Sequence, residues 1–260
     1  MPAMPAMPAE PVERQYLYCF FRGDQPETFS SKGMGERGDP VVTMHYKDLA
    51  AVVSTSPEAE YDSSRRNMLN HTKVLEEVME RHSILPVRFN TISPDRGMLE
   101  RLLQSRYDEL IAELGRMEGK VEMGVKALWY EGIVFQEILA EREDIRQLRD
   151  SLQGKSPEKT YYERIRLGEM VEEAVRRKRS LDEDMILTAL GSHADQVRAN
   201  ETFGERMIVN ASFLVDRAKE PDLDAAIRVL DAQQTQRVLF RYVGPVPPYN
   251  FVNLIIHWNN

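Results

Sequence analysis

One segment near the middle of the chain, residues 121–130, alternates with the period of a β-strand. Every second residue from Val121 to Trp129 is apolar, whereas the residues between them are charged, apolar or glycine. Successive side chains of a strand point to opposite faces, so this strand has one wholly apolar face and one mixed face. The apolar face has to be buried against another layer, which predicts a sheet packed on helices.

Two long helical segments follow this strand. We expect helices over 133–152 and 157–190, joined by the turn Gln153-Gly154-Lys155-Ser156, and together they form an antiparallel arm. Ser180-Leu181-Asp182-Glu183 also fits a capping box, so a separate helix that starts there stays an alternative. The second helix carries a heptad seam with polar breaks, at Leu167, Val171, Ala174, Lys178, Leu181, Met185 and Thr188.

The remainder of the second half predicts a strand over 207–215, a short helix over 222–233 and a last strand over 238–243. The order of elements from residue 121 is therefore strand, helices, strand, helix and strand. This order resembles a ferredoxin-like α+β layer that carries a long helical insertion.

The first half also mixes strands and helices. We expect strands over 15–21, 40–44, 49–54 and 84–89, and a loop over the Gly-rich polar stretch 22–39. Helices are predicted over 62–82 and from the Ser93-Pro94 cap to Gly115. The apolar stripe of the first helix consists of Met68, Thr72, Leu75, Val78, Met79 and His82. The fold class is therefore α+β with two domains.

The boundary between these domains is placed at Glu118-Gly119. The repeated prolines of residues 1–9 favour an extended, disordered leader over 1–14. We expect a small mixed α+β domain over 15–118, and a modified ferredoxin-like domain over 119–243 with its helical hairpin at about 131–190. An apolar tail over 244–260 completes the chain.

Composition narrows the class of function. The net charge is −8, so the chain lacks the global basic field that attracts nucleic acid or an anionic membrane. Cys19 is the only cysteine, which excludes an internal disulfide and disfavours a cysteine-based zinc site. We see no secretory signal and no apolar run of the ~18 residues that a membrane helix needs. We therefore expect a cytoplasmic protein without a membrane partner.

Candidate catalytic residues do not form a known pattern. His71 and His82 share a predicted helix face, but they lie about 16 Å apart by helix geometry, too far for one metal ion. They are interpreted as packing residues at the edge of the core. Ser192, His193 and Asp195 are the letters of a catalytic triad, but triads are built from distant segments. We predict no enzyme, no metal site and no cofactor.

Two other motifs receive structural interpretations. Gly33-Met34-Gly35-Glu36-Arg37-Gly38 has the glycine spacing of a dinucleotide site but lacks the strand and helix that such a site needs. Arg176-Arg177-Lys178-Arg179 is the only basic cluster, and Asp182-Glu183-Asp184 follows at once. Because these acids cancel much of the positive field, we interpret the cluster as a solvated helix surface and predict no nucleic-acid partner.

Two apolar segments remain as candidates for protein binding. Arg88 interrupts the apolar strand 84–89, so it points outward, pairs with a carboxylate or binds a partner. Pro247-Pro248 cannot sit inside a sheet ladder, yet large apolar residues follow without acidic, lysine or arginine charge. This tail either covers its own domain as an added strand or offers a docking surface. The candidate binding residues are Arg88, Phe89, Tyr249, Phe251 and Val252.

Taken in order, several short motifs resemble those of the gas vesicle protein L/F family (GvpL/GvpF), and the resemblance covers nearly everything after the leader. Cys19 and Asn90 stand where the family often has Gly, and Met123 and Val246 stand where it often has Trp. The resemblance implies two domains, the second of them a modified ferredoxin-like fold. The matching pieces are Tyr16-Leu17-Tyr18, residues 49–54, His71 with Val74 and Val78, and residues 85–89, 119–126, 210–215 and 244–252.

The resemblance also implies a function. Members are accessory proteins of gas vesicles, which are buoyant protein-walled compartments, and are expected to bind the hydrophobic shell protein and other accessory proteins during assembly. This role places the protein in the cytoplasm at the gas vesicle and involves no enzymatic activity. Two alternatives stay open, namely a regulatory or nucleic-acid-binding module on a ferredoxin-like sheet, and a hydrolase that uses His193 or His71.

Overall fold

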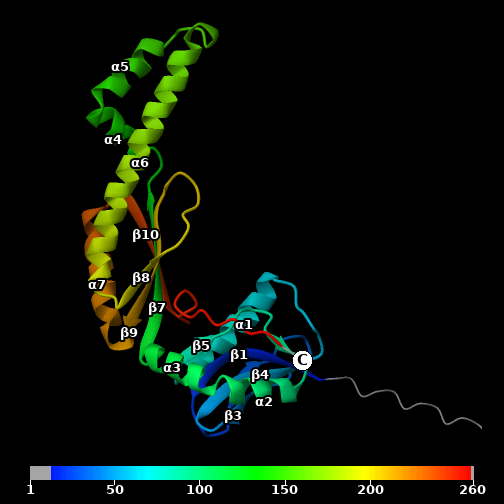
Figure 1. The fold of residues 1–260 in the computed structure, drawn as a ribbon. Coiled ribbons are helices and arrows are strands. Elements are labelled where there is room, and N and C mark those ends of the chain that lie inside the picture. Colours follow the sequence, from blue (N-terminus) through cyan, green and yellow to red (C-terminus); the bar gives the residue numbers. More distant parts are fainter. Residues whose placement is uncertain (1–12, 259–260) are drawn as a thin grey trace, which may run out of the picture. The chain divides into compact units, whose positions relative to one another are not determined.

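The computed structural model describes residues 13–258 and divides them into two compact units. Unit 1 comprises the residues up to Val121 together with those from Val246 onward, and unit 2 comprises Glu122–Pro245. The tail, drawn in red in Figure 1, therefore belongs to the unit formed by the first part of the chain. The predicted leader lies outside the described residues except for Glu13 and Arg14, and Arg14 already belongs to a strand.

Unit 1 is built on a sheet of six strands in the order β2-β3-β4-β1-β5, with β6 also paired to β1. The central strand β1 is buried from Tyr16 to Phe21, because helices cover both faces of the sheet. A register shift in β1 between Leu17 and Cys19 turns Tyr18 and Cys19 to the same face, toward the first helix. The strands are β1 (Arg14–Arg22), β2 (Thr28–Lys32), β3 (Pro40–Tyr46), β4 (Leu49–Ser56), β5 (Ile84–Pro86) and β6 (Ile92–Ser93).

Three helices flank this sheet: α1 (Arg65–Met79), α2 (Arg96–Ser105) and α3 (Tyr107–Met117). Helix α1 packs on one face, and α2 and α3 pack on the other (Figure 1). The stretch predicted to be a loop contains β2, in which Phe29 and Ser31 alternate inward with exposed neighbours. The single helix predicted from Ser93 is wrong, because the chain caps α2 with Asp95 and breaks again at Arg106.

Hydrogen-bonded polar side chains lie inside the core between β1 and α1. Tyr16 Oη lies 3.0 Å from His71 Nδ1, and Tyr18 Oη lies 2.9 Å from Ser54 Oγ. His71 is buried, whereas Met68 is exposed, so the inward stripe of α1 is rotated from its predicted position. Burial lowers the pKa of His71 to about 4, which keeps the imidazole neutral at neutral pH. His71 is therefore a core residue and not an edge residue.

Unit 2 is a sheet of four strands in the order β10-β7-β9-β8, with helices after its first and third strands. This is the βαββαβ arrangement of ferredoxin-like domains, as predicted. Strand β8 was missed in the sequence because it is short and all four of its residues are exposed. The strands are β7 (Lys120–Trp129), β8 (Gln196–Ala199), β9 (Met207–Asp216) and β10 (Val238–Val246).

The helical arm of unit 2 is real but differs in detail from the prediction. Its first helix is broken at Arg142, whereas α6 runs without interruption through Ser180, so no separate helix begins there. The heptad seam is wrong beyond Lys178, because Leu181 is exposed and Asp182 is buried. The elements are α4 (Ile133–Glu141), α5 (Glu143–Leu152), the 3-10 turns η1 (Glu158–Thr160) and η2 (Arg217–Lys219), α6 (Tyr161–Gly191) and α7 (Glu220–Gln233).

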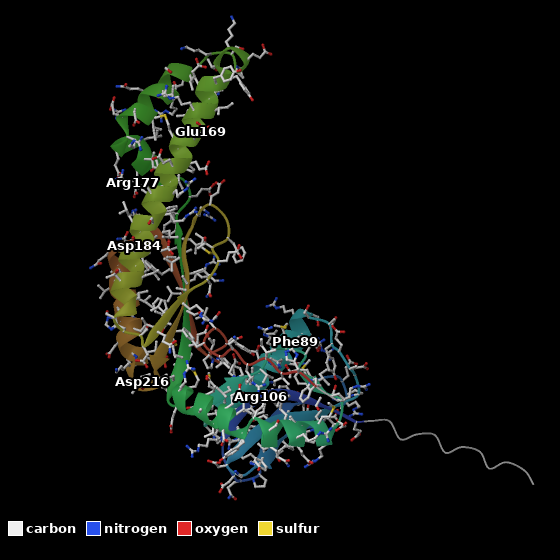
Figure 2. All side chains as sticks on the ribbon, in the orientation of Figure 1. Phe89, Arg106, Glu169, Arg177, Asp184 and Asp216 are labelled. Carbon is white, nitrogen blue, oxygen red and sulfur yellow. The ribbon has the colours of Figure 1, made fainter. Side chains whose placement is uncertain are left out.

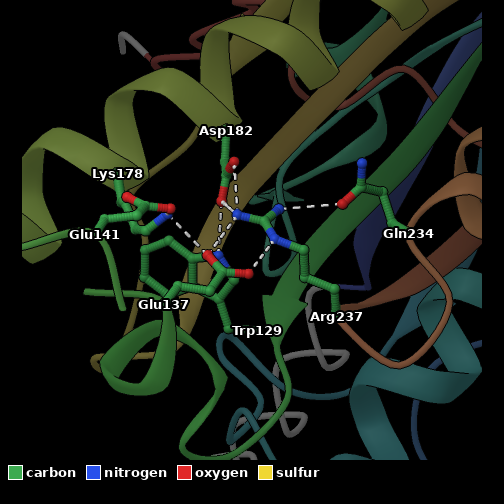
Figure 3. A network of polar contacts seen from close by, with 7 residues as sticks. All are labelled: Trp129, Glu137, Glu141, Lys178, Asp182, Gln234 and Arg237. Atoms are coloured by element: carbon green, nitrogen blue, oxygen red, sulfur yellow. Dashed lines mark hydrogen bonds and ion pairs between the residues drawn. The ribbon is translucent and has the colours of Figure 1, made fainter. Parts of the chain in front are cut away.

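A network of charges explains why Asp182 faces inward (Figure 3). Its carboxylate accepts a hydrogen bond of 2.7 Å from Trp129 Nε1 and two, of 2.8 and 3.0 Å, from Arg237 Nη2. Arg237 Nε also donates to Glu137 at 2.6 Å, and Lys178 Nζ lies 2.9 Å from Glu137. Hydrogen bonding to Glu137 raises the pKa of Arg237, and the same contact lowers the pKa of Glu137. The network joins β7, α4, α6 and the turn before β10.

Replacing Asp182 with alanine should lower the free energy of unfolding by about 2–3 kcal/mol, because charge-assisted hydrogen bonds to Arg237 are lost together with the Trp129 bond. Urea unfolding followed by circular dichroism measures this change. Asp184→Ala is the matched control, since Asp184 lies on the same helix, is exposed and has no ion pair among residues 13–258. The control should change stability by less than about 0.5 kcal/mol. Equal losses in both variants would contradict the assigned role.

The buried His71 should make unit 1 less stable in mild acid. Its folded pKa of about 4 lies below the ordinary value of 6.5, so the unfolded chain binds the proton first as the pH falls. The wild type should therefore lose about 1 kcal/mol more than His71→Gln between pH 7.5 and pH 5.5. Urea titrations of both proteins at the two pH values measure this difference, and parallel pH slopes would contradict a buried, neutral imidazole.

Candidate protein-binding surface

The loop after β5 is held on the core of unit 1 by backbone contacts. Val87 N donates to Tyr18 O at 3.0 Å, and Asn90 N donates to Tyr16 Oη at 3.1 Å. Asn90 adopts a left-handed φ of 67°, and the chain then pairs with β1 again as β6. The predicted strand therefore ends at Pro86, and Arg88 and Phe89 lie on a fixed loop.

Arg88 and Phe89 take different positions on this loop. Arg88 is exposed and has no carboxylate partner within residues 13–258, so its side chain points outward. Its binding to a partner stays a prediction. Phe89, labelled in Figure 2, is half-buried. Its ring centroid lies 5.8 Å from that of His71 and 6.4 Å from that of Tyr16. The loop thus presents one free cation beside a partly accessible aromatic ring.

The predicted tail begins with the end of β10, and its residues 247–258 are held on unit 1 without forming a strand. Pro248 O accepts hydrogen bonds of 3.1 Å from the backbone of both Phe251 and Val252, which closes a turn. Phe251 and Leu254 are only 9% and 8% exposed. Arg106 Nη1 donates to Ile255 O at 2.7 Å, and Arg106 is labelled in Figure 2. Of the two alternatives for the tail, the added strand does not form over residues 247–258, and buried side chains hold this segment instead.

Other side chains of the tail remain accessible. Tyr249 is 40% exposed and Ile255 is 47% exposed, whereas Val252 is half-buried. Burial raises the pKa of Tyr249, and the nearby charge of Glu76 in α1 adds to that shift. Burial also raises the pKa of Tyr16 in β1, and Tyr249 adds to that shift in turn. Because Phe89 also packs near Tyr16, the structure brings the two predicted binding segments to the same part of unit 1. We give the name tail surface to the accessible residues of these two segments, which are Arg88, Phe89, Tyr249, Val252 and Ile255.

The candidate triad is not assembled. Ser192 Oγ donates to Ala189 O at 3.2 Å, and the described residues show no hydrogen bond between Ser192 and His193. Over residues 13–258, no group of three or more His, Cys, Asp or Glu side chains is placed to hold a metal ion. In the same range, no helix is long and apolar enough to cross a membrane.

The basic cluster on α6 is only partly a solvated surface. Arg176 pairs with Glu172 at 3.0 Å on the surface, and Arg177 is exposed. Lys178 instead joins the buried network, and the Arg179 guanidinium lies 5.8 Å from the centroid of the Trp129 ring. Sequence reasoning missed this inward half. The available signal was the spacing of four in this part of α6, which turns each member of the series only about 40° from the one before it. The series is Ala174, Lys178, Asp182, Ile186 and Leu190.

Comparisons with known proteins agree with this fold. The family described as "Gas vesicle synthesis protein GvpL/GvpF" matches residues 14–253. Gas vesicle protein F of Streptomyces sp. (strain CB03234) is 33% identical over 238 residues, covering 91% of this chain and 98% of that protein. Gas vesicle protein F of Dolichospermum flosaquae is 27% identical over 242 residues, covering 92% and 97%.

Two crystal structures of gas vesicle protein GvpF are also similar. The protein from Anabaena sp. PCC7120 has a TM-score of 0.83 and 25% identity, covering 94% of this chain and 100% of that one. The protein from Microcystis aeruginosa has a TM-score of 0.75 and 25% identity, covering 93% and 99%. The resemblance seen in the short motifs is thereby confirmed, and this chain belongs to the GvpL/GvpF family of gas vesicle synthesis proteins.

Proposed function

We propose that this protein is a gas vesicle accessory protein that binds the hydrophobic shell protein and other accessory proteins while the vesicle forms. It acts in the cytoplasm, at the gas vesicle, by binding and not by catalysis. Membership of the GvpL/GvpF family supports the gas vesicle role. The observation that carries the binding role is the tail surface, where apolar side chains are exposed although the segment that bears them is anchored.

Anchoring matters because binding costs conformational entropy. A free tail would have to be ordered at the moment of binding, which weakens affinity. Here Phe251 and Leu254 are already packed in unit 1, so Tyr249 and Ile255 are held in place before a partner arrives. Each Å² of apolar surface that the shell protein covers then contributes about 25 cal/mol before association costs. The proposal therefore gives Phe251 the role of an anchor, and Tyr249, Val252 and Phe89 the role of direct contacts.

Arg88 supplies the polar edge of this surface. Protein interfaces commonly combine an apolar centre with a charged rim, and the rim contributes more to partner choice than to affinity. Arg88 fits that position because it is exposed beside Phe89 and has no internal ion pair among the described residues. The nucleic-acid alternative gains no support, since Arg176 and Lys178 are each paired with glutamates.

Removing the exposed apolar side chains should weaken capture of the shell protein. The double variant Tyr249→Ser/Ile255→Ser should capture shell protein at about one tenth of the wild-type amount or less. A tenfold loss corresponds to about 1.4 kcal/mol of binding free energy, as expected for an interface hot spot. The measurement is the amount of shell protein that copurifies with the tagged full-length chain after coexpression.

Leu181→Ser is the matched control for that experiment. Leu181 is an exposed apolar residue on α6, outside the tail surface, so its loss should leave capture unchanged. The melting temperatures of all three proteins show whether each remains folded. Wild-type capture by a folded double variant would remove the tail surface from the proposal.

Loosening the anchor should have a similar effect on capture without touching the contact residues. Phe251→Ala removes a buried ring, so the tail should leave unit 1 more often and become a site of rapid proteolysis. Capture of the shell protein should fall although Tyr249 and Ile255 are unchanged. Limited digestion with chymotrypsin, followed by mass spectrometry, locates the cut. Unchanged capture with a released tail would contradict the importance of preorganisation.

A further inference from the structure

A groove of about 1010 Å³ lies within unit 2, beside the arm helix α6. Its opposite wall is the loop between β8 and β9, which stands next to α6 in Figure 1. Three aromatic side chains from three separate segments line it: Tyr130, Phe135 and Phe203. All three are exposed, and Phe203 is 66% exposed. Large aromatic rings that converge on one hollow without covering each other mark a binding groove.

The α6 wall of the groove is shaped to receive another helix. Gly168, Val171, Val175 and Arg179 follow one another at steps of three and four, so they lie on one face of α6. Residues 168–179 span about 16 Å at 1.5 Å per residue, which matches three turns of a partner helix. At Gly168 a side chain would meet no atom within 4 Å, so this position leaves room for close approach. Helix pairs pack by setting such ridges into grooves.

Arg179 places an unneutralised charge in this wall. Its Nη2 donates to Glu205 O at 2.7 Å, and its guanidinium lies against the Trp129 ring. Its Nε is buried and has no hydrogen-bond partner in the described residues, and no carboxylate there pairs with it. A half-buried cation without a counter-ion is costly. A carboxylate from an occupant of the groove would supply that counter-ion and a charge-assisted hydrogen bond.

We propose that this groove binds an amphipathic helix of another gas vesicle protein, with a carboxylate of that helix pairing with Arg179. This inference rests on the proposed function, because it names the chemistry of one partner of the accessory protein. Apolar side chains of the helix contact Tyr130, Phe135 and Phe203. Nucleic acid is a poorer occupant, because the groove offers phosphates no net positive charge. Its charged lining consists of Glu131, Glu172 and Glu205 together with Arg176, Arg179 and Arg206.

The test is a photo-crosslink from the groove in cells that carry the full gas vesicle gene set. A benzophenone amino acid replaces Phe203, and in a second strain it replaces Tyr162, an exposed aromatic residue on the arm outside the groove. Mass spectrometry maps the cross-linked segment. The expected product at position 203 is a helical segment of another gas vesicle protein, with Asp or Glu among apolar residues at steps of three and four.

Two variants of the full-length chain then test the contacts. Arg179→Glu should reduce the cross-link at least tenfold, whereas Arg177→Glu should not, because Arg177 is exposed on the same helix and lies outside the groove. Gly168→Trp should block the groove without straining α6, and Gly168→Ala should leave the cross-link intact. Exchanging the partner's carboxylate for arginine should restore the cross-link to the Arg179→Glu chain.

Several results would overturn the inference. These are an equal yield at position 162, a cross-linked segment without a carboxylate, a cross-link to nucleic acid, or full yield after both Arg179→Glu and Gly168→Trp. If the groove variants still copurify the shell protein while the cross-link at 203 is absent, the groove proposal alone is wrong. If the wild-type chain captures no gas vesicle protein in any strain, the proposed function fails together with the inference.

Discussion

The carboxylate of Asp182 is the constraint on which the arrangement of unit 2 depends. It receives the indole N–H of Trp129 from the sheet and the guanidinium of Arg237 from the turn before β10, while it sits on the arm helix. A carboxylate buried to this extent has to be fully paired, so these three elements cannot shift independently. Lys178 and Glu137 extend the same pairing to α4. The base of the arm is therefore positioned by charge geometry, whereas apolar packing holds its hairpin.

In unit 1, the residues from Val246 onward pack on the domain that the first part of the chain forms. Residues 247–258 belong to no strand, so their position depends on Phe251, Leu254 and the bond from Arg106 to Ile255 O. The core that lies nearby contains Tyr16 hydrogen-bonded to Nδ1 of a neutral His71, so a polar pair is buried there without a charge. The same Tyr16 ring supports Phe89. Tyr16 therefore connects the polar contacts of this core with the loop that bears Phe89.

The helices and strands that could be predicted from the sequence are those in which buried and exposed residues alternate with a regular period. The alternation of residues 121–130 identifies β7, and the order of strands and helices identifies the ferredoxin-like unit. Strand β8 could not be found, because its residues are all exposed and leave no alternation. The heptad seam failed at Asp182 because burial there depends on Arg237, 55 positions away. For the same reason Arg88 and Tyr249 could be named as candidates, but their exposure could not be derived.

The two surfaces proposed for binding share one physical device, although they belong to different units. In each surface, a buried aromatic ring positions a more accessible side chain before a partner arrives. Phe251 holds the segment of Tyr249, and Trp129 supports the guanidinium of Arg179. Their chemistry differs, because the tail surface combines apolar contact with a solvated cation, whereas the groove adds a half-buried cation that lacks a counter-ion. A partner selected by the first needs apolar area, and a partner selected by the second also needs a carboxylate at one position. On the two proposals taken together, the tail surface selects a uniformly hydrophobic shell subunit and the groove selects a charged helical partner.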